Sequence, residues 1–376
     1  MDVIAPGDLL HSFADLPDPR AHNIVHPLPD ILLIAIMAVL CGADDWPSIE
    51  RFGQSKLKWL GTFMDLNRGI PSHDTFERVF AALSPQAFER CFLLWSRELA
   101  RHSGGRLVAI DGKSIRRSFD AADGKAAIHM VSAFCQRNHV VLGQLATEVK
   151  SNEITAIPKL LELLELKDTT VTIDAMGCQK QIARQIVEAG GDYVLAVKDN
   201  HPTLHEEVKF LFQEAIATGF QMPHAYHETV EKDHGRIERR RCWSVWDVGW
   251  FQDREDWASL GSFVCVEATR QIGEQTSTER RYYLSSHDGR DAAMLLEAVR
   301  GHWGIENRLH WQLDVSFGED QRRGRKQHAA ENFSRLSRLA LNLLKKEKST
   351  KMSIKTKRLN CGWDHDYLLK VLMNLA

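Results

Sequence analysis

The feature that most constrains the fold of this chain is the order of patterned segments between residues 106 and 219. Three short strand-like runs come first, and a helix-like segment and then alternating strands and helices follow them. The expected strands are 106–111, 129–138, 139–148, 169–177 and 192–200, and the expected helices are 151–166, 178–190 and 201–219. The second and third strands meet near 137–139 as a hairpin. This order, βββαβαβα, predicts an α/β fold with a mixed sheet and helices on its faces.

Two of the expected strands end on an aspartate. Asp111 follows the apolar run 108–110, and Asp174 follows 169–173. The order is that of a ribonuclease-H-like fold, in which the first and fourth strands lie side by side. We therefore expect Asp111 and Asp174 to be neighbours at the carboxyl ends of these strands, with Gly112 turning the chain away. The stretch "VAIDGKSIRR" alone is more typical of a turn with a solvated Asp, and the rest of the chain favours a metal site.

Two adjacent ionised carboxylates repel each other, and a divalent cation relieves that repulsion. Mg²⁺ and Mn²⁺ prefer carboxylate oxygens and retain waters that substrate phosphates can replace. The pair Asp111 and Asp174 therefore predicts a metal site. A third carboxylate would complete a site for two ions, the arrangement that serves phosphodiester chemistry.

A late helix offers the third carboxylate. In residues 291–320 one apolar stripe repeats every four positions, and Glu306 begins the stripe beside it. Burial of the apolar stripe can fix Glu306 against the sheet; its members are Ile305, Leu309, Leu313 and Phe317. Glu319 and Asp320 are alternative third ligands, and Asp314 either lies near the metals or faces solvent.

The pattern divides the chain into three expected parts. Residues 1–103 form a helical N-terminal domain, in which Ser72 is a helix N-cap. Residues 104–345 form the α/β domain, with a β-rich insertion at about 220–287, and residues 346–376 form a basic C-terminal tail.

Charge is unevenly distributed along the chain. Residues 321–358 hold six Arg and seven Lys against two Glu, a net charge of +11, whereas the whole chain carries −2. A polyanionic partner is one explanation, and a solvated helix face followed by a loose tail is the other. The longest apolar run, 31–41, is too short to span a bilayer, and the seven Cys form no C-x-x-C pair. We expect a protein of the reducing cytoplasm with neither a zinc site nor a disulfide framework.

Several long motifs resemble the DDE transposases of bacterial insertion sequences, in particular the ISAs-type, H-repeat-associated family. The motifs are "AIDGKSIRRS" (109–118), "TIDAMGCQK" (172–180), "DYVLAVKDNHPTL" (192–204) and "HWGIENRLHWQLDVSFGED" (302–320). Residues 18–53 resemble the helical domain associated with that family. The resemblance covers nearly the whole chain.

The resemblance implies a ribonuclease-H-like transposase that cleaves DNA at insertion-sequence ends and joins the 3′ ends to target DNA. Asp111, Asp174 and Glu306 would be its catalytic acids and would bind two Mg²⁺ or Mn²⁺ ions. The implied partners are double-stranded DNA, as terminal inverted repeats and as target, and a second copy of the chain in a homodimer, on the nucleoid when DNA is bound. Related families carry a Lys after this Glu, but Leu313 and Asp314 occupy that region here, so no role is carried over for it.

Basic and polar residues near the expected site are candidates for contact with DNA phosphates. Each of them can also simply be part of a solvated loop. The candidates are Lys113, Arg116, Arg117, Lys198, Asn200, Arg322, Arg323 and Arg325. Two rival functions stay open, a catalytically inactive DNA-binding relic of a transposase and a ribonuclease-H-like nuclease with other substrates.

Overall fold

The chain folds into two compact units in the computed structural model. The structure describes residues 7–22, 24–100, 107–119, 126–147, 153–233 and 235–373. Unit 1 comprises residues 1–104, 112–152 and 306–376, and unit 2 comprises residues 105–111 and 153–305. The predicted domain division stays a prediction, and its boundary at 103/104 lies outside the described residues.

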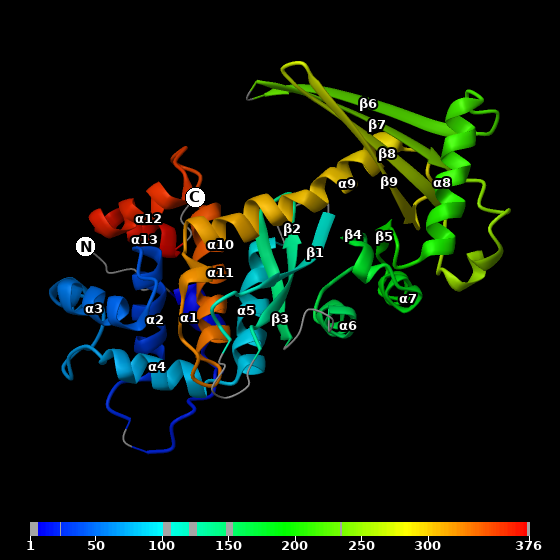
Figure 1. Cartoon of the computed structure of the whole chain (residues 1–376). Coiled ribbons are helices and arrows are strands. Elements are labelled where there is room, and N and C mark those ends of the chain that lie inside the picture. The colour runs from blue at the N-terminus through cyan, green and yellow to red at the C-terminus, as the bar shows by residue number, and fades with distance from the viewer. Residues whose placement is uncertain are drawn as a thin grey trace. The chain divides into compact units, whose positions relative to one another are not determined.

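Helices dominate unit 1 (Figure 1). They are α1 (Gly7–Ser12), α2 (Leu28–Leu40), α3 (Trp46–Leu60), α4 (His73–Ala82), α5 (Pro85–Ala100), α10 (Trp311–Val315), α11 (Ala329–Lys346), α12 (Ile354–Trp363) and α13 (His365–Met373). The apolar run 31–40 makes α2 a core helix that packs against α3, α11, α12 and α13. Ser72 Oγ accepts a hydrogen bond from the Thr75 amide at 3.4 Å, which confirms the predicted N-cap of α4. No helix in the described ranges is long and apolar enough to cross a membrane.

Strands β2 (His129–Cys135) and β3 (Val140–Thr147) of unit 1 form the predicted antiparallel hairpin. Strand β1 (Leu107–Ser114) divides between the units, and its last residues belong with β2 and β3. The expectation that this strand ends at Asp111 and turns at Gly112 is therefore wrong. The strand continues because Lys113 and Ile115 both point into buried surroundings, where Ile115 joins Ile128 and Met130 in a small apolar cluster.

Unit 2 carries the larger part of the sheet. The strands are β4 (Thr170–Ile173), β5 (Asp192–Val197), β6 (His224–Asp233), β7 (Arg236–Val245), β8 (Ser262–Ile272) and β9 (Gln275–Ser285). The strand order of the nine-stranded sheet is β3-β2-β1-β4-β5-β9-β8-β7-β6. β1, β4 and β5 are parallel, and β9 joins β5 antiparallel. This order places the first strand beside the fourth and confirms the ribonuclease-H-like mixed sheet.

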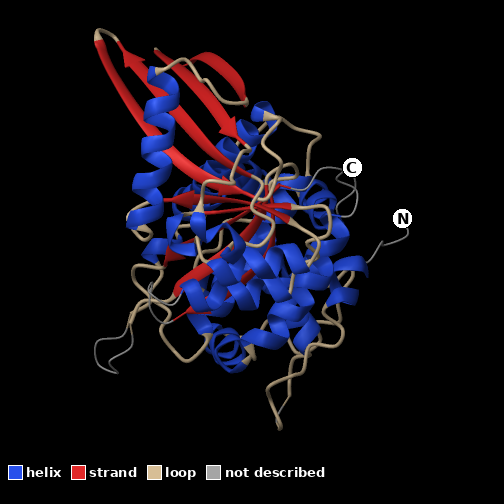
Figure 2. Cartoon of the chain, turned by 90° about the vertical axis from the view of Figure 1, so that its right-hand side faces the viewer, coloured by secondary structure: helices blue, strands red, loops and turns tan. Residues whose placement is uncertain are grey.

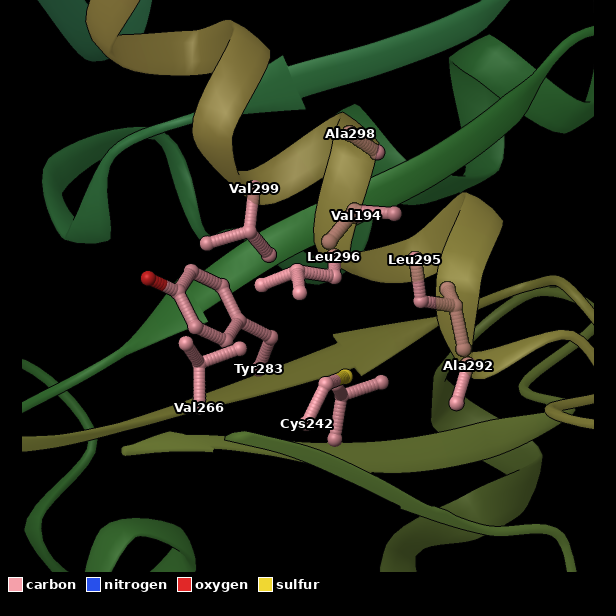
Figure 3. Close-up of a cluster of buried hydrophobic side chains, with 10 residues drawn as sticks. Val194, Cys242, Val266, Tyr283, Ala292, Leu295, Leu296, Ala298 and Val299 are labelled. Carbon is pink, nitrogen blue, oxygen red and sulfur yellow. The ribbon is translucent and has the colours of Figure 1, made fainter. Parts of the chain in front are cut away.

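Strands β6 to β9 form two long antiparallel hairpins where the sequence indicated strands, and Figure 2 shows them in red. The helices of unit 2 are α6 (Glu153–Glu162), α7 (Lys180–Glu188), α8 (Pro202–Ala217) and α9 (Ala292–Ile305). Figure 3 shows the inner face of α9, where Leu295, Leu296 and Val299 meet the side chains of β5, β7, β8 and β9. These strand residues are Val194, Cys242, Val264, Val266 and Tyr283. Their burial fixes α9 across unit 2's part of the sheet.

The segment expected to be a basic C-terminal tail contains two helices, α12 and α13. Lys357 is buried and donates from Nζ to the Leu344 carbonyl at 2.9 Å and lies 3.1 Å from Glu347 Oε2. Arg358 is buried as well and donates to the Val39 carbonyl and to Asp44 Oδ1. The segment folds because its apolar residues, among them Cys361, Leu368 and Val371, are buried, which a count of charges does not reveal.

Candidate functional site

Asp111 and Asp174 occupy matching positions on two neighbouring strands of unit 2. The parallel register of β1 and β4 ends with Ile110 opposite Ile173, and the two aspartates are the next residues of their chains. Both side chains are half-buried. Since neighbouring strands lie about 4.8 Å apart and matching positions share a face, the two carboxylates belong to one side of the sheet. The expected adjacency of these strands is confirmed, whereas the role of the acids stays a prediction.

The backbone that follows β4 holds the Asp174 side chain in place. Asp174 caps the short turn η2 (Ala175–Gly177), and its Oδ1 accepts from the Met176 amide at 3.1 Å and from the Gly177 amide at 3.5 Å. A Cβ on Gly177 would lie 2.2 Å from Ile173 Cγ2, so only glycine fits this turn. Asn200 Nδ2 donates to the Ala175 carbonyl at 2.5 Å from the end of β5. The turn orients one oxygen of Asp174 through the backbone and is itself supported by the next strand.

The last turn of α9 lies on the face of β4 that carries Thr172. Thr172 Oγ1 is 3.2 Å from His302 Nδ1, and Thr172 shares a face with Asp174 because the two are two residues apart. Burial lowers the pKa of His302, and the attraction of Asp174 only partly opposes this, so the imidazole is neutral at pH 7. Arg300 pairs with both carboxylate oxygens of Glu231 on β6, at 2.6 and 2.8 Å. His302 and Arg300 thus fix α9 to unit 2.

Glu306 directly follows α9 and opens the π-helical turn η4 (Glu306–His310) of unit 1. Its side chain is exposed. The predicted apolar stripe is confirmed, since Ile305, Leu309, Leu313 and Phe317 are all fully buried. A period of four exceeds the 3.6 residues of an α-helical turn, and the wider π turn absorbs the difference. Such turns recur at functional sites, but the role of Glu306 stays a prediction.

The donor chemistry of Asp111 and Asp174 fits a hard divalent cation. Within the ranges that the structure describes, however, no group of three or more His, Cys, Asp or Glu side chains forms a metal-binding arrangement. Asp111 and Asp174 lie at matching positions within unit 2. Their role as metal ligands, and that of a third acid, stays a prediction.

Lys113, predicted to contact DNA, is instead enclosed by carboxylates of unit 1. Its Nζ lies 2.8 Å from Asp314 Oδ1, 3.0 Å from Asp320 Oδ1 and 3.4 Å from Glu319 Oε2, and the side chain is 8% exposed. Burial lowers the pKa of Lys113, but the attraction of Glu319 and the hydrogen bonds that Lys113 donates to Asp314 and Asp320 raise it overall. This ammonium group is charged and already paired, so it is not available to DNA phosphates.

The alternative third acids take part in the same cluster of charges, and the choice among them stays a prediction. Glu319 is 1% exposed and binds Arg338 Nη1 at 2.8 Å and Ser334 Oγ at 2.7 Å. Burial raises its pKa, yet the attraction of Arg338, Lys113 and Arg322 lowers the pKa of Glu319 to about 2. Glu319 is thus a structural anion, and Asp320 pairs with Lys113 and Arg116. Asp314 is half-buried, and its Oδ1 lies against the Lys113 ammonium group.

The other predicted DNA contacts fall into two groups. Arg322 is withdrawn from solvent, since it donates to Ser337 Oγ and the Phe317 carbonyl at 2.8 Å, and burial lowers its pKa to about 10. Asn200 is exposed but its amide binds the turn after Asp174. The exposed or half-exposed cations are Arg116, Arg117, Lys198, Arg323 and Arg325.

Part of the basic run 321–358 lies inside unit 1. Arg335 is buried and binds Glu89 Oε2 at 2.8 Å and Glu331 Oε1 at 2.9 Å. Arg338, Lys357 and Arg358 are likewise buried in ion pairs. Sequence reasoning missed these pairs and weighed only a polyanionic partner against a solvated face. The sequence feature that could have indicated these pairs is Glu89, which lies within an otherwise apolar face of α5. A buried acid requires a cationic partner.

Two family models match this chain. One described as "Transposase DDE domain" matches residues 102–343, and one described as "DDE_Tnp_1-associated" matches residues 10–96. Together they cover the segments that hold Asp111, Asp174 and Glu306 and the helices α2 to α4.

Several curated relatives align over nearly the whole chain. "Putative transposase YncI" of Escherichia coli O157:H7 is 44% identical over 373 residues, 98% of this chain and 95% of that one. "H repeat-associated putative transposase YhhI" of Escherichia coli strain K12 is 39% identical over 97% of each chain. "Inactive transposase YbfQ" of the same strain is 46% identical over 72 residues, 19% of this chain and 86% of that one. The cryo-EM structure of a piggyBac transposase synaptic complex with hairpin DNA aligns with a TM-score of 0.42 at 10% identity, over 96% of this chain and 77% of that one, a likeness too weak to carry a conclusion.

Proposed function

This chain belongs to the DDE transposases, in the H-repeat-associated group, and from this premise we propose that it cleaves DNA at insertion-sequence ends and joins the freed 3′ ends to target DNA. The observation that carries the proposal is the matched placement of Asp111 and Asp174 at the end of the β1–β4 register. The reaction takes place on nucleoid DNA in the cytoplasm, with double-stranded DNA as both donor and target.

In this proposal Asp111, Asp174 and Glu306 hold two Mg²⁺ or Mn²⁺ ions. Such a pair of ions, when bound, stabilises the attacking and the leaving oxygen of an in-line displacement at phosphorus. The amides of Met176 and Gly177 hold one oxygen of Asp174, so its carboxylate is ordered before any ligand arrives. Water is the first nucleophile, and the freed 3′-hydroxyl is the second.

The cations that contact the DNA backbone in this proposal are those whose side chains are exposed or half-exposed to solvent. We propose this role for Arg116, Arg117, Lys198, Arg323 and Arg325, and no longer for Lys113 and Arg322. Contacts of this kind add affinity without reading sequence. A homodimer that pairs two element ends completes the proposal.

The test uses a labelled duplex that carries the terminal repeats flanking the gene, incubated with Mg²⁺ or Mn²⁺. The wild-type protein is expected to nick at the repeat boundary, and Asp111→Asn, Asp174→Asn and Glu306→Gln to lose nicking at least a hundredfold while they bind the duplex normally. Glu98→Gln, an exposed acid of α5, is the matched control and should nick normally. Equal nicking by all three variants contradicts the assignment, and cleavage of branched or hybrid duplexes without preference for the repeats identifies a nuclease instead.

One observation favours a second candidate, a DNA-binding relic without activity. A relative of this chain is named an inactive transposase. Strong binding of the repeats with no nicking under either metal would support the relic.

A further inference from the structure

We propose that Lys113 is a positioning residue of the transposase reaction, because within unit 1 it ties the segment that follows Glu306 to the last residues of β1. The inference rests on the proposed function and deepens it. Lys113 would touch neither DNA nor metal. Its part would be to hold α10 and η5 against the last residues of β1 within unit 1.

Three ion pairs of Lys113 lie within unit 1. Its ammonium group meets three carboxylates at 2.8, 3.0 and 3.4 Å, those of Asp314, Asp320 and Glu319. Asp314 belongs to α10, while Glu319 and Asp320 belong to the turn η5 (Glu319–Gln321). One cation therefore binds both elements that follow η4.

Lys113 and its partner Asp314 both lie close in sequence to proposed catalytic acids. Lys113 comes two residues after Asp111 on β1, so both side chains project from the same face of the strand. Asp314 comes eight residues after Glu306, at the end of a segment whose Leu309 and Leu313 are fully buried. The segment between Glu306 and Asp314 is thus pinned by apolar burial along its length and by Lys113 at its end.

The cluster depends on the ammonium charge. Two further cations hold the outer oxygens: Arg338 Nη1 lies 2.8 Å from Glu319 Oε1, and Arg116 Nε lies 3.2 Å from Asp320 Oδ2. Without Lys113, three acids would face one another in a low-dielectric setting with too few cations. Repulsion would move α10 and η5 away from β1. Displacements of about 1 Å at a reacting centre cost on the order of a hundredfold in rate.

The experiment compares Lys113→Met and Lys113→Arg in the full-length protein. The readout is the nicking rate of the repeat duplex as a function of Mg²⁺ concentration, measured well below the unfolding temperature. Lys113→Met is expected to nick at least tenfold more slowly and to need at least threefold more Mg²⁺ for half-maximal rate. Lys113→Arg keeps the charge. It is expected to recover most of the wild-type nicking rate and most of the wild-type response to Mg²⁺. The affinity for DNA should change less than twofold, because Lys113 is buried.

Arg335→Met is the matched control, since Arg335 is an equally buried cation of unit 1 whose partners, Glu89 and Glu331, lie on α5 and α11. It should destabilise the protein and leave the Mg²⁺ requirement of the folded fraction unchanged. If Lys113→Met does not fold, Asp314→Asn replaces it, with the same expected rise in the Mg²⁺ requirement. A normal rate and normal Mg²⁺ response in the folded Lys113 or Asp314 variant overturns the inference. If Lys113→Met instead loses DNA affinity and its affinity depends less steeply on salt, Lys113 contacts a DNA phosphate and the inference is wrong.

Amide hydrogen exchange over residues 306–321 tests the inference without relying on activity. Faster exchange in Lys113→Met than in Arg335→Met supports it, and equal exchange overturns it. Failure of the proposed function gives a different pattern, namely no nicking by the wild-type protein or unimpaired nicking by Asp174→Asn.

Discussion

Glu319 and Arg338 form an ion pair inside unit 1, with Glu319 Oε1 2.8 Å from Arg338 Nη1 and neither side chain more than 1% exposed. Lys113 and Ser334 complete the surroundings of the same carboxylate. Burying charges is unfavourable unless each one is paired, so this cluster stabilises unit 1 only as a complete set. Its members come from β1 and from η5 and α11, and β1 precedes the other two elements by about two hundred residues in the sequence.

We predict that Glu319→Gln lowers the free energy of unfolding at pH 7 by about 3–5 kcal/mol, because it leaves Lys113 and Arg338 buried without their anion. The pKa of Glu319 is lowered to about 2 in the folded protein, so its carboxylate stabilises the fold fully above its ordinary pKa of 4.5. That contribution is lost as the pH falls from about 4.5 to about 2. Urea unfolding at a series of pH values should show a constant difference between wild type and variant from pH 5 to 8 and a shrinking difference below. The exposed Glu98→Gln variant should show neither effect, and a difference that grows on acidification would refute the prediction.

We predict that Gly177→Ala destabilises unit 2 by about 1–3 kcal/mol and slows nicking, because the new methyl group would collide with Ile173 next to Asp174. Gly362→Ala is the control, since a Cβ there has Cys41 O as its nearest neighbour at 3.5 Å and the residue lies in α12. Urea unfolding midpoints followed by near-ultraviolet dichroism measure both variants. Wild-type stability in Gly177→Ala would contradict the close packing of this turn against Ile173.

We predict opposite effects for two adjacent arginines. Arg323 is exposed, so Arg323→Gln should weaken DNA binding at every sequence and reduce the slope of log affinity against log salt by about 0.9, with stability unchanged. Arg322 donates to Ser337 and Phe317, so Arg322→Gln should lower the unfolding midpoint and leave the salt slope of the folded protein unchanged. Fluorescence anisotropy with labelled duplex at several salt concentrations measures the slopes. Equal slopes for wild type and Arg323→Gln would remove Arg323 from the DNA contacts.

The order of elements was predictable because it depends on local pattern. The alternation of Val171 and Ile173 with polar neighbours and the four-residue spacing of Leu309 and Leu313 both follow from which side chains must leave water. These patterns suffice for the ribonuclease-H-like sheet, the neighbouring strands of Asp111 and Asp174, and the stripe beside Glu306.

The partners of charged residues were not predictable in the same way. From the sequence, Lys113, Arg322 and Arg335 were interpreted as solvated or DNA-binding cations. Their acidic partners, such as Glu89 for Arg335, lie far away in the chain. A count of charge reports only how many cations a segment holds. Whether a cation faces water depends on tertiary packing, and for the same reason the sequence misplaced the end of β1 and the fold of residues 346–376.

We propose that Asp174 binds the catalytic metal, and a switch of metal preference tests this role directly. Asp174→Cys replaces a hard carboxylate ligand by a thiolate, which binds Mg²⁺ poorly and softer ions such as Mn²⁺ or Cd²⁺ well. We predict that Asp174→Cys does not nick the repeat duplex in Mg²⁺ and regains nicking in Mn²⁺ or in Mn²⁺ with trace Cd²⁺, whereas the wild-type protein nicks in Mg²⁺. Nicking by Asp174→Cys in Mg²⁺ at the wild-type rate would contradict the claim that Asp174 is a metal ligand.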